Sequence, residues 1–105
     1  MINVEIGQVS DKALLFDLST QEIEPSDLAL LQFPRLEGTK GVVIADLSAW
    51  MMAAAVSEYT NQAAWIGVVD EVAKDDKHCI VIWSVASNYK RGQIVPLNEL
   101  GLENI

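Results

Sequence analysis

The sequence has little positive charge, one cysteine and one histidine. Only 7 basic residues stand against 15 acidic ones, so the net charge is -8 over 105 residues. Broad, non-specific nucleic-acid binding needs a positive field, and we therefore expect no DNA partner. The charge does not exclude a small, enclosed site for an anion.

Long hydrophobic runs are also absent. No apolar stretch approaches the roughly 20 residues that cross a membrane, and Met1 to Glu5 lacks the basic segment of a signal peptide. We expect neither secretion nor a membrane partner. Cys79 has no second cysteine with which to form an internal disulfide, which fits a cytoplasmic protein.

What the sequence does have is hydrophobic content. Half of its residues are hydrophobic and 21% are charged, a balance typical of a folded chain. The length suits one hydrophobic core, and no repeat, low-complexity tract or Gly/Ser-rich linker interrupts the chain. We expect residues 1–105 to form a single domain.

The first third predicts a hairpin and a short helix. Residues 3–9 alternate, with Val4 and Ile6 on one face, which indicates a half-buried strand. Turn residues at 10–12 lead to a second strand over 13–18. Pro25 and the acidic residues beside it are typical of a helix start, and this helix is expected to continue to Pro34.

The rest of the chain predicts a mixed sheet. An apolar run at 42–45 indicates a strand buried on both faces, followed by a helix from Ala49 to about Asn61. Three more strands are expected at 64–69, 79–86 and 93–97, the last at a sheet edge because of Pro96. The order is ββαβαβββ, an α/β domain with one strand–helix–strand unit.

The second predicted helix is unusually apolar. Residues 49–56 are hydrophobic all round, and such a helix is buried on more than one side. In so short a chain the extra cover most simply comes from a second subunit, so we expect a homodimer.

The junction between the central strand and this helix is the best general site. Ligands of α/β sheets bind beyond the carboxyl ends of strands, and free N–H groups at a helix start favour anions. Asp46 and Ser48 either cap the helix or contact a ligand, and the sequence leaves both readings open. Trp50 is placed to stack on a base, although core packing is the ordinary role of a tryptophan.

Few other residues carry chemistry. His78 is the only histidine, so one chain cannot build a multi-histidine metal site. The acidic pairs at 70–71 and 75–76 suit either a hard cation or a solvated turn. Asp70 directly follows a strand. Lys40, Lys90 and Arg91 lie in predicted loops, where they form the positive rim that an anion would meet.

Several segments, taken in order, resemble the small CRISPR-associated ring nucleases of type III systems. The specific part runs from Lys40 through Val42-Val43-Ile44 to Asp70, and the remaining matches are at 23–28, 33–34, Trp50 and Tyr59. The resemblance implies a Rossmann-like fold related to CARF domains and binding and cleavage of cyclic tetra-adenylate. It also implies manganese-dependent RNA exonuclease activity and dimers that assemble further, into tetramers, around the nucleotide.

The sequence departs from this family where the chemistry is carried out. The family has histidines at the end of the second helix, where this chain has Tyr59, Thr60 and Asn61. The arginine that follows the family's aspartate is also missing after Asp70, and the usual Gly-rich loop reads Asp46-Leu47-Ser48. We therefore expect cleavage to be weak or lost, with Asp70 the one candidate catalytic residue and the metal undetermined.

Two functions follow as hypotheses. The first is a divergent ring-nuclease-like protein that binds a cyclic oligoadenylate or short RNA. Its candidate ligand-binding residues are Lys40, Asp46, Ser48, Trp50, Tyr59, Thr60 and Asn61. The alternative is a small acidic interaction or regulatory module without a nucleotide ligand.

Overall fold

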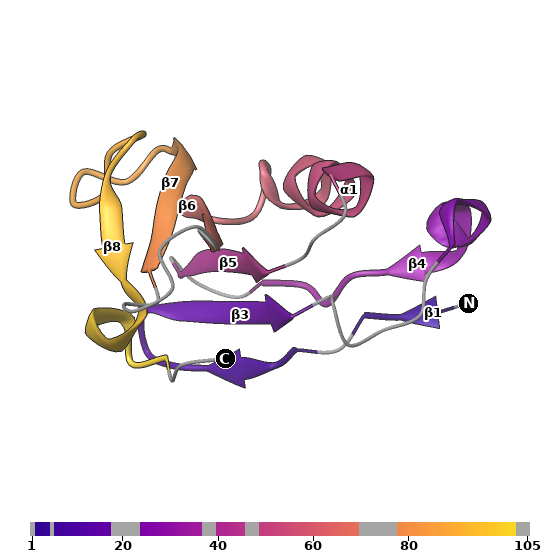
Figure 1. The fold of residues 1–105 in the computed structure, drawn as a ribbon, viewed down its shortest axis with the longest axis horizontal. Helices are drawn as coiled ribbons and strands as arrows, with labels where there is room; N and C mark the ends of the chain where they lie inside the picture. Colours follow the sequence, from indigo (N-terminus) through magenta and orange to yellow (C-terminus); the bar gives the residue numbers. More distant parts are fainter. Residues whose placement is uncertain are drawn as a thin grey trace.

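The fold is built on a six-stranded mixed sheet (Figure 1). The computed structural model describes residues 2–4, 6–17, 24–36, 40–45, 49–69 and 78–102. The strand order of the sheet is β2-β3-β5-β6-β7-β8. These strands span Gln8–Val9, Ala13–Asp17, Gly41–Ala45, Trp65–Val69, His78–Ser84 and Ile94–Pro96.

Three parallel strands form the centre of this sheet. β3 pairs with β5 and β5 with β6 in parallel, and α1 (Ala49–Tyr59) connects β5 to β6. β2, β7 and β8 are antiparallel to their neighbours. The predicted strand–helix–strand unit and the edge position of Pro96 are both found, and the protein is an α/β protein with a mixed sheet.

The side chains of the central strands alternate between two apolar clusters. On β5, Val42 and Ile44 belong to the cluster beneath α1, whereas Val43 and Ala45 belong to the cluster on the opposite face. All five residues of β5 are buried, as the continuous apolar run predicts. Both faces of the sheet are therefore covered.

The face under α1 is covered by one side of that helix (Figure 1). Met51, Ala55 and Tyr59, spaced four residues apart, are its buried residues. Ala53 is exposed, and Met52 is half-buried. The single chain thus leaves part of the apolar helix uncovered, and dimerisation through it remains a prediction.

The opposite face is covered by η3, a 3-10 helix at Leu97–Leu100 that the sequence analysis does not predict. Leu97 and Leu100 are fully buried in the second cluster. The Ser10 hydroxyl donates to the Leu100 carbonyl, and the Lys12 ammonium donates to the Glu99 carbonyl at 3.0 Å. These hydrogen bonds connect η3 to the turn between β2 and β3.

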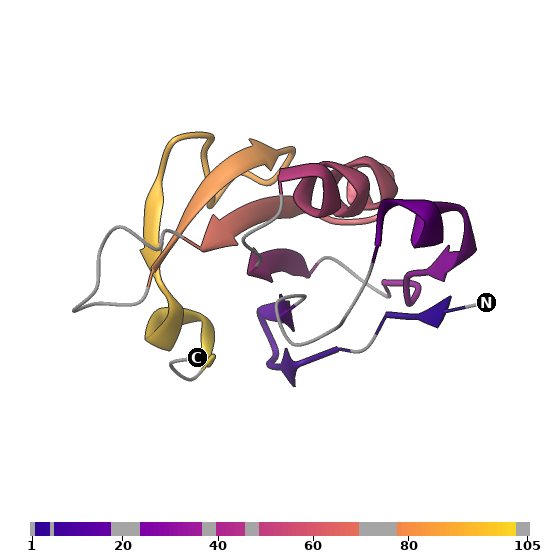
Figure 2. The same ribbon diagram turned by 45° about the vertical axis from the view of Figure 1, so that its right-hand side comes forward.

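The beginning of the chain differs most from the prediction. The single strand expected at 3–9 is instead β1 (Ile2–Asn3) and β2. β1 pairs in parallel with β4 (Leu31–Gln32), and together they form a separate two-stranded sheet beside the main one (Figure 2). Val4 is buried while Ile6 is 37% exposed, so the predicted common face is wrong.

The first predicted helix is also shorter than expected. It is a 3-10 helix, η2, at Pro25–Leu30, and the chain is extended again at β4 before Pro34. None of its residues is buried. Because no apolar face is packed against the sheet, nothing stabilises the longer helix, and the predicted order ββαβαβββ holds only from β5 onward.

In the described part of the chain, no helix is long and apolar enough to span a membrane.

Candidate functional site

The parallel strands give the sheet two chemically different ends. The carboxyl ends of β3, β5 and β6 lie together, and so do their amino ends, because Ala13 pairs with Gly41 and Val42 with Ile66. The helix α1 runs back from the first end to the second. Each predicted site residue that the structure describes can be assigned to one of these two ends.

Trp50 lies at the carboxyl end, in the first turn of α1. It is half-buried and packs against the cluster under the helix, so part of its ring surface remains accessible. Asp46, Ser48 and Asp70, predicted at the same end, lie outside the described residues, as do the predicted helix cap and acidic turn. His78, the first residue of β7, also belongs to this end, because the next residue, Cys79, pairs with Val69.

Lys40 lies at the amino end, directly before β5. Its carbonyl accepts a hydrogen bond from the Ala64 N–H at 3.1 Å, which ties it to the start of β6. Thr60 and Asn61 follow the last turn of α1 at the same end. The Thr60 hydroxyl donates to the Ser57 carbonyl at 3.3 Å, and Asn61 is exposed.

Tyr59 is a core residue in this structure. Its side chain is fully buried, stacks on Phe16 with ring centroids 5.3 Å apart, and meets the edge of Phe33 at 5.8 Å. Its hydroxyl donates to the Pro34 carbonyl at 2.8 Å. Burial, and to a lesser extent the charge of Glu58, raises the pKa of Tyr59. Tyr59 thus holds α1 against the 33–36 segment, and its hydroxyl is already engaged.

The predicted ligand residues are therefore divided between the two ends. Lys40 was expected to reach the ligand beside Ser48 and Trp50. The structure places Lys40 before β5, whereas Trp50 follows that strand, and β5 alone spans about 16 Å at 3.3 Å per residue. A lysine side chain does not cover that distance. Within one chain, the described members of the predicted site do not converge.

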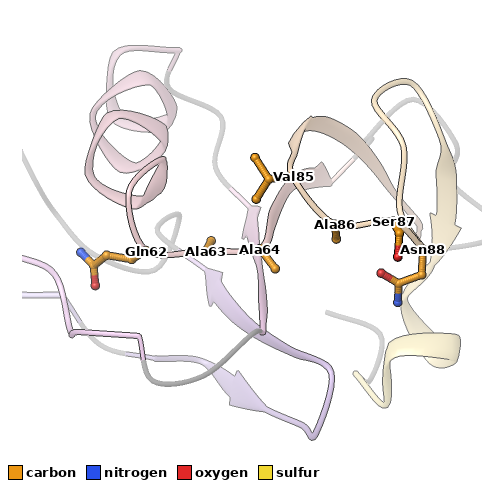
Figure 3. A pocket seen from close by; sticks show the side chains of 7 residues that line it. All are labelled: Gln62, Ala63, Ala64, Val85, Ala86, Ser87 and Asn88. Carbon is orange, nitrogen blue, oxygen red and sulfur yellow. The ribbon is translucent and has the colours of Figure 1, made fainter.

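The amino end contains a pocket that the sequence analysis does not identify (Figure 3). Its volume is about 450 Å³, and it lies where the turn after α1 meets the loop after β7. The lining residues are Gln62, Ala63, Ala64, Val85, Ala86, Ser87 and Asn88. The one feature of the sequence that could have indicated this pocket is the polar pair Ser87 and Asn88, shortly before Lys90 and Arg91.

Hydrogen bonds fix the shape of this pocket. The Val85 N–H donates to the Ala64 carbonyl at 2.9 Å, and the Ser84 hydroxyl donates to the Tyr89 carbonyl at 2.6 Å. The ring of Tyr89 lies 4.6 Å from that of Trp65, the first residue of β6. The loop after β7 is thus held to the start of β6 by backbone and aromatic contacts.

No metal site is formed by the described residues, which contain no group of three His, Cys, Asp or Glu side chains able to hold an ion. The two carboxylates predicted to matter most, Asp46 and Asp70, lie outside those residues. Manganese therefore remains an implication of the resemblance. Cys79 is a free, buried thiol whose burial raises its pKa to about 11, so it stays protonated near neutral pH.

The fold defines a small α/β protein with a mixed six-stranded sheet and one strand–helix–strand unit. A comparison with protein families gives a more specific result. The family described as "CRISPR-associated protein (Cas_csx3)" matches residues 16–96, from within β3 to the last residue of β8. The chain belongs to this family of CRISPR-associated proteins, and no curated protein matches it.

Proposed function

We propose that this protein binds a cyclic oligoadenylate, with cyclic tetra-adenylate the first candidate, in CRISPR-associated antiviral defence, and that it cleaves RNA weakly or not at all. Membership of a CRISPR-associated family supports a role in CRISPR-associated defence. The resemblance to ring nucleases supports the ligand and a Rossmann-like, CARF-related reading of the βαβ unit. Its lone, buried Cys79 suits the cytoplasm.

Weak or absent cleavage is supported mainly by the types of residue found at the end of α1. Thr60 and Asn61 occupy this turn, and neither titrates near neutral pH. A general base needs a pKa near the working pH. The only histidine of the chain, His78, starts β7 at the opposite end of the sheet.

The separation of the two ends bears on how a nucleotide is bound. A ligand held between copies of the chain would contact Trp50 of one copy and Lys40, Thr60 or Asn61 of another. This arrangement agrees with a homodimer that assembles further into a tetramer. At a net charge of -8, long-range attraction is unfavourable, so binding relies on short-range donors and on stacking.

Titration of the protein with labelled cyclic tetra-adenylate tests this proposal. Stacking is worth about 1–3 kcal/mol per base, so Trp50→Ala should weaken binding about 5- to 150-fold. Trp83→Phe is the control, because Trp83 is also partly buried against the same core cluster but lies on β7. Equal losses in the two variants would mean that damaged packing, not stacking, explains the effect.

The alternative function, an interaction module, is supported by a different surface. Ile80 and Ile94 are directly paired on β7 and β8, and Ile82 shares their face. Ile94 is 61% and Ile82 38% exposed. If no cyclic or linear oligoadenylate binds, and Ile94→Asp abolishes binding of an identified protein partner, this function replaces the first.

A further inference from the structure

Basic side chains gather at the amino end of the sheet. Lys12 and Lys40 directly precede the paired strands β3 and β5. Leu36, next to Arg35, donates its N–H to the Gln62 side chain at 3.0 Å, which places Arg35 beside the turn after α1. Within the described ranges, every lysine and arginine lies at this end: Lys12, Arg35, Lys40, Lys90 and Arg91.

The five basic side chains differ in the contacts that they make with the described residues. The ammonium of Lys12 donates to the Glu99 carbonyl. For Arg35, Lys40, Lys90 and Arg91, no side-chain hydrogen bond or ion pair to another described residue is formed. Cations gathered in one region of a protein of net charge -8 create a local positive field that attracts anions.

The pocket described above lies within this basic end. Lys40 accepts the Ala64 N–H, and the loop that supplies Val85 to Asn88 continues into Lys90. Small apolar side chains form its middle, with Ser87 and Asn88 together on one side (Figure 3). Ser87 and Asn88 are both exposed, so the Ser87 hydroxyl and the Asn88 amide are accessible to a ligand in the pocket.

We propose that this pocket binds a phosphate monoester with an apolar body, of the size of a nucleoside monophosphate. The alanines and Val85 contact the base, and Ser87 and Asn88 donate hydrogen bonds. Lys40 and Lys90 neutralise the phosphate, whose charge-assisted hydrogen bonds are the stronger ones. The volume of about 450 Å³ lies within the usual range for small-molecule sites and greatly exceeds that of a phosphate ion.

This proposal does not depend on binding of a cyclic oligoadenylate. The pocket lies at the opposite end of the sheet from Trp50, its ligand is a linear mononucleotide, and Lys40 is the one residue assigned to both ligands. A protein that fails to bind cyclic tetra-adenylate can still bind adenosine 5′-monophosphate. The two proposals therefore fail separately.

Amide NMR titrations of the whole protein with adenosine 5′-monophosphate, adenosine and inorganic phosphate test the site. We expect saturable shifts centred on Ala64, Ser87 and Asn88 with the monophosphate. Adenosine and phosphate should each bind at least tenfold more weakly. Equal affinities for adenosine and its monophosphate, or no shifts at millimolar concentration, would overturn the proposal.

Matched variants distinguish binding in the pocket from non-specific attraction to the positive charge at this end of the sheet. Lys90→Ala and Asn88→Ala should each weaken monophosphate binding at least fivefold, while amide dispersion shows that the fold is intact. Lys12→Ala is the control, because it removes the same charge from the same end but its ammonium is bound to η3. An equal loss with Lys12→Ala would reduce the site to a diffuse electrostatic surface and refute the proposal.

Discussion

The packing of Gly41 against Trp65 gives the sharpest stability prediction. A Cβ atom built on Gly41 would lie 1.9 Å from Cε2 of Trp65 and 2.3 Å from Cζ2, far inside van der Waals contact with the indole ring. Trp65 is only 2% exposed and is packed against Tyr89. The ring therefore has no free space into which to move, and Gly41→Ala should force a rearrangement of the core.

The effect of Gly41→Ala on the free energy of unfolding can be estimated from two opposing contributions. Overpacking a core typically costs about 1–3 kcal/mol, and so close a contact between a Cβ and a ring belongs at the upper end of that range. Replacing glycine by alanine within a strand stabilises the folded state by roughly 0.5–1 kcal/mol, because alanine loses less backbone entropy on folding. We expect a net loss of about 2 kcal/mol in the free energy of unfolding.

Gly67 and Gly92 provide the comparison. A Cβ on Gly67 would lie 2.9 Å from the sulfur of Cys79, a milder contact, whereas one on Gly92 meets nothing within 4 Å. Alanine at Gly92 is strained only by its φ of +93°. Urea denaturation should therefore rank the loss of stability as largest for Gly41→Ala.

A double-mutant cycle then isolates the cause. In a Trp65→Leu background the indole ring is gone, so Gly41→Ala should cost at least 1 kcal/mol less than in the wild type. The same cost in both backgrounds, or a Gly41→Ala protein as stable as the wild type, would refute the close packing of β5 against Trp65.

Three further predictions concern buried groups and assembly. Tyr59→Phe should lower stability by about 1–2 kcal/mol in urea denaturation, because the half-buried Pro34 carbonyl loses its donor. The pKa of Cys79 is about 11 when folded, against 9.0 as a reference, so its contribution is present below pH 9 and is lost as the pH rises toward 11. Relative to Cys79→Ala, the wild type should therefore lose about 1 kcal/mol between pH 7 and 10, and an unchanged difference would contradict the buried, protonated thiol. Ala54→Glu should dissociate the dimer in sedimentation experiments, and a wild type that is monomeric at micromolar concentration would remove the predicted interface.

The central part of the fold could be predicted because its pattern and its packing agree. The continuous apolar run of β5 specifies a strand buried on both faces, and the helix after it starts at Ala49 as expected. Pro96 lacks the N–H that a central strand would need, so the last strand lies at the edge.

In the first third the predicted hairpin is found as β2 and β3, but other elements could not be predicted, because they depend on distant partners. β1 is only two residues long and forms by pairing with β4, almost thirty residues later in the chain. Likewise, η3 is stabilised by burial of Leu97 and Leu100 against the far face of the sheet. Local alternation or helix-start signals contain no information about such contacts.

The sequence indicates candidate site residues, which stay a prediction, but not how they are arranged in space. The sequence identified Lys40 and Trp50, yet their positions at opposite ends of β5 follow only from the parallel register. The pocket at Ala64 and Asn88 joins segments separated by more than twenty residues, which no local motif indicates.

We propose that this member of a CRISPR-associated family binds a cyclic oligoadenylate and cleaves it weakly or not at all. The most direct test is to incubate the protein in excess over labelled cyclic tetra-adenylate, with and without manganese, and to measure bound ligand and linear product in the same samples. We expect saturable binding and no accumulation of linear product over hours. Rapid conversion to linear product, or no binding at any protein concentration, would contradict the account.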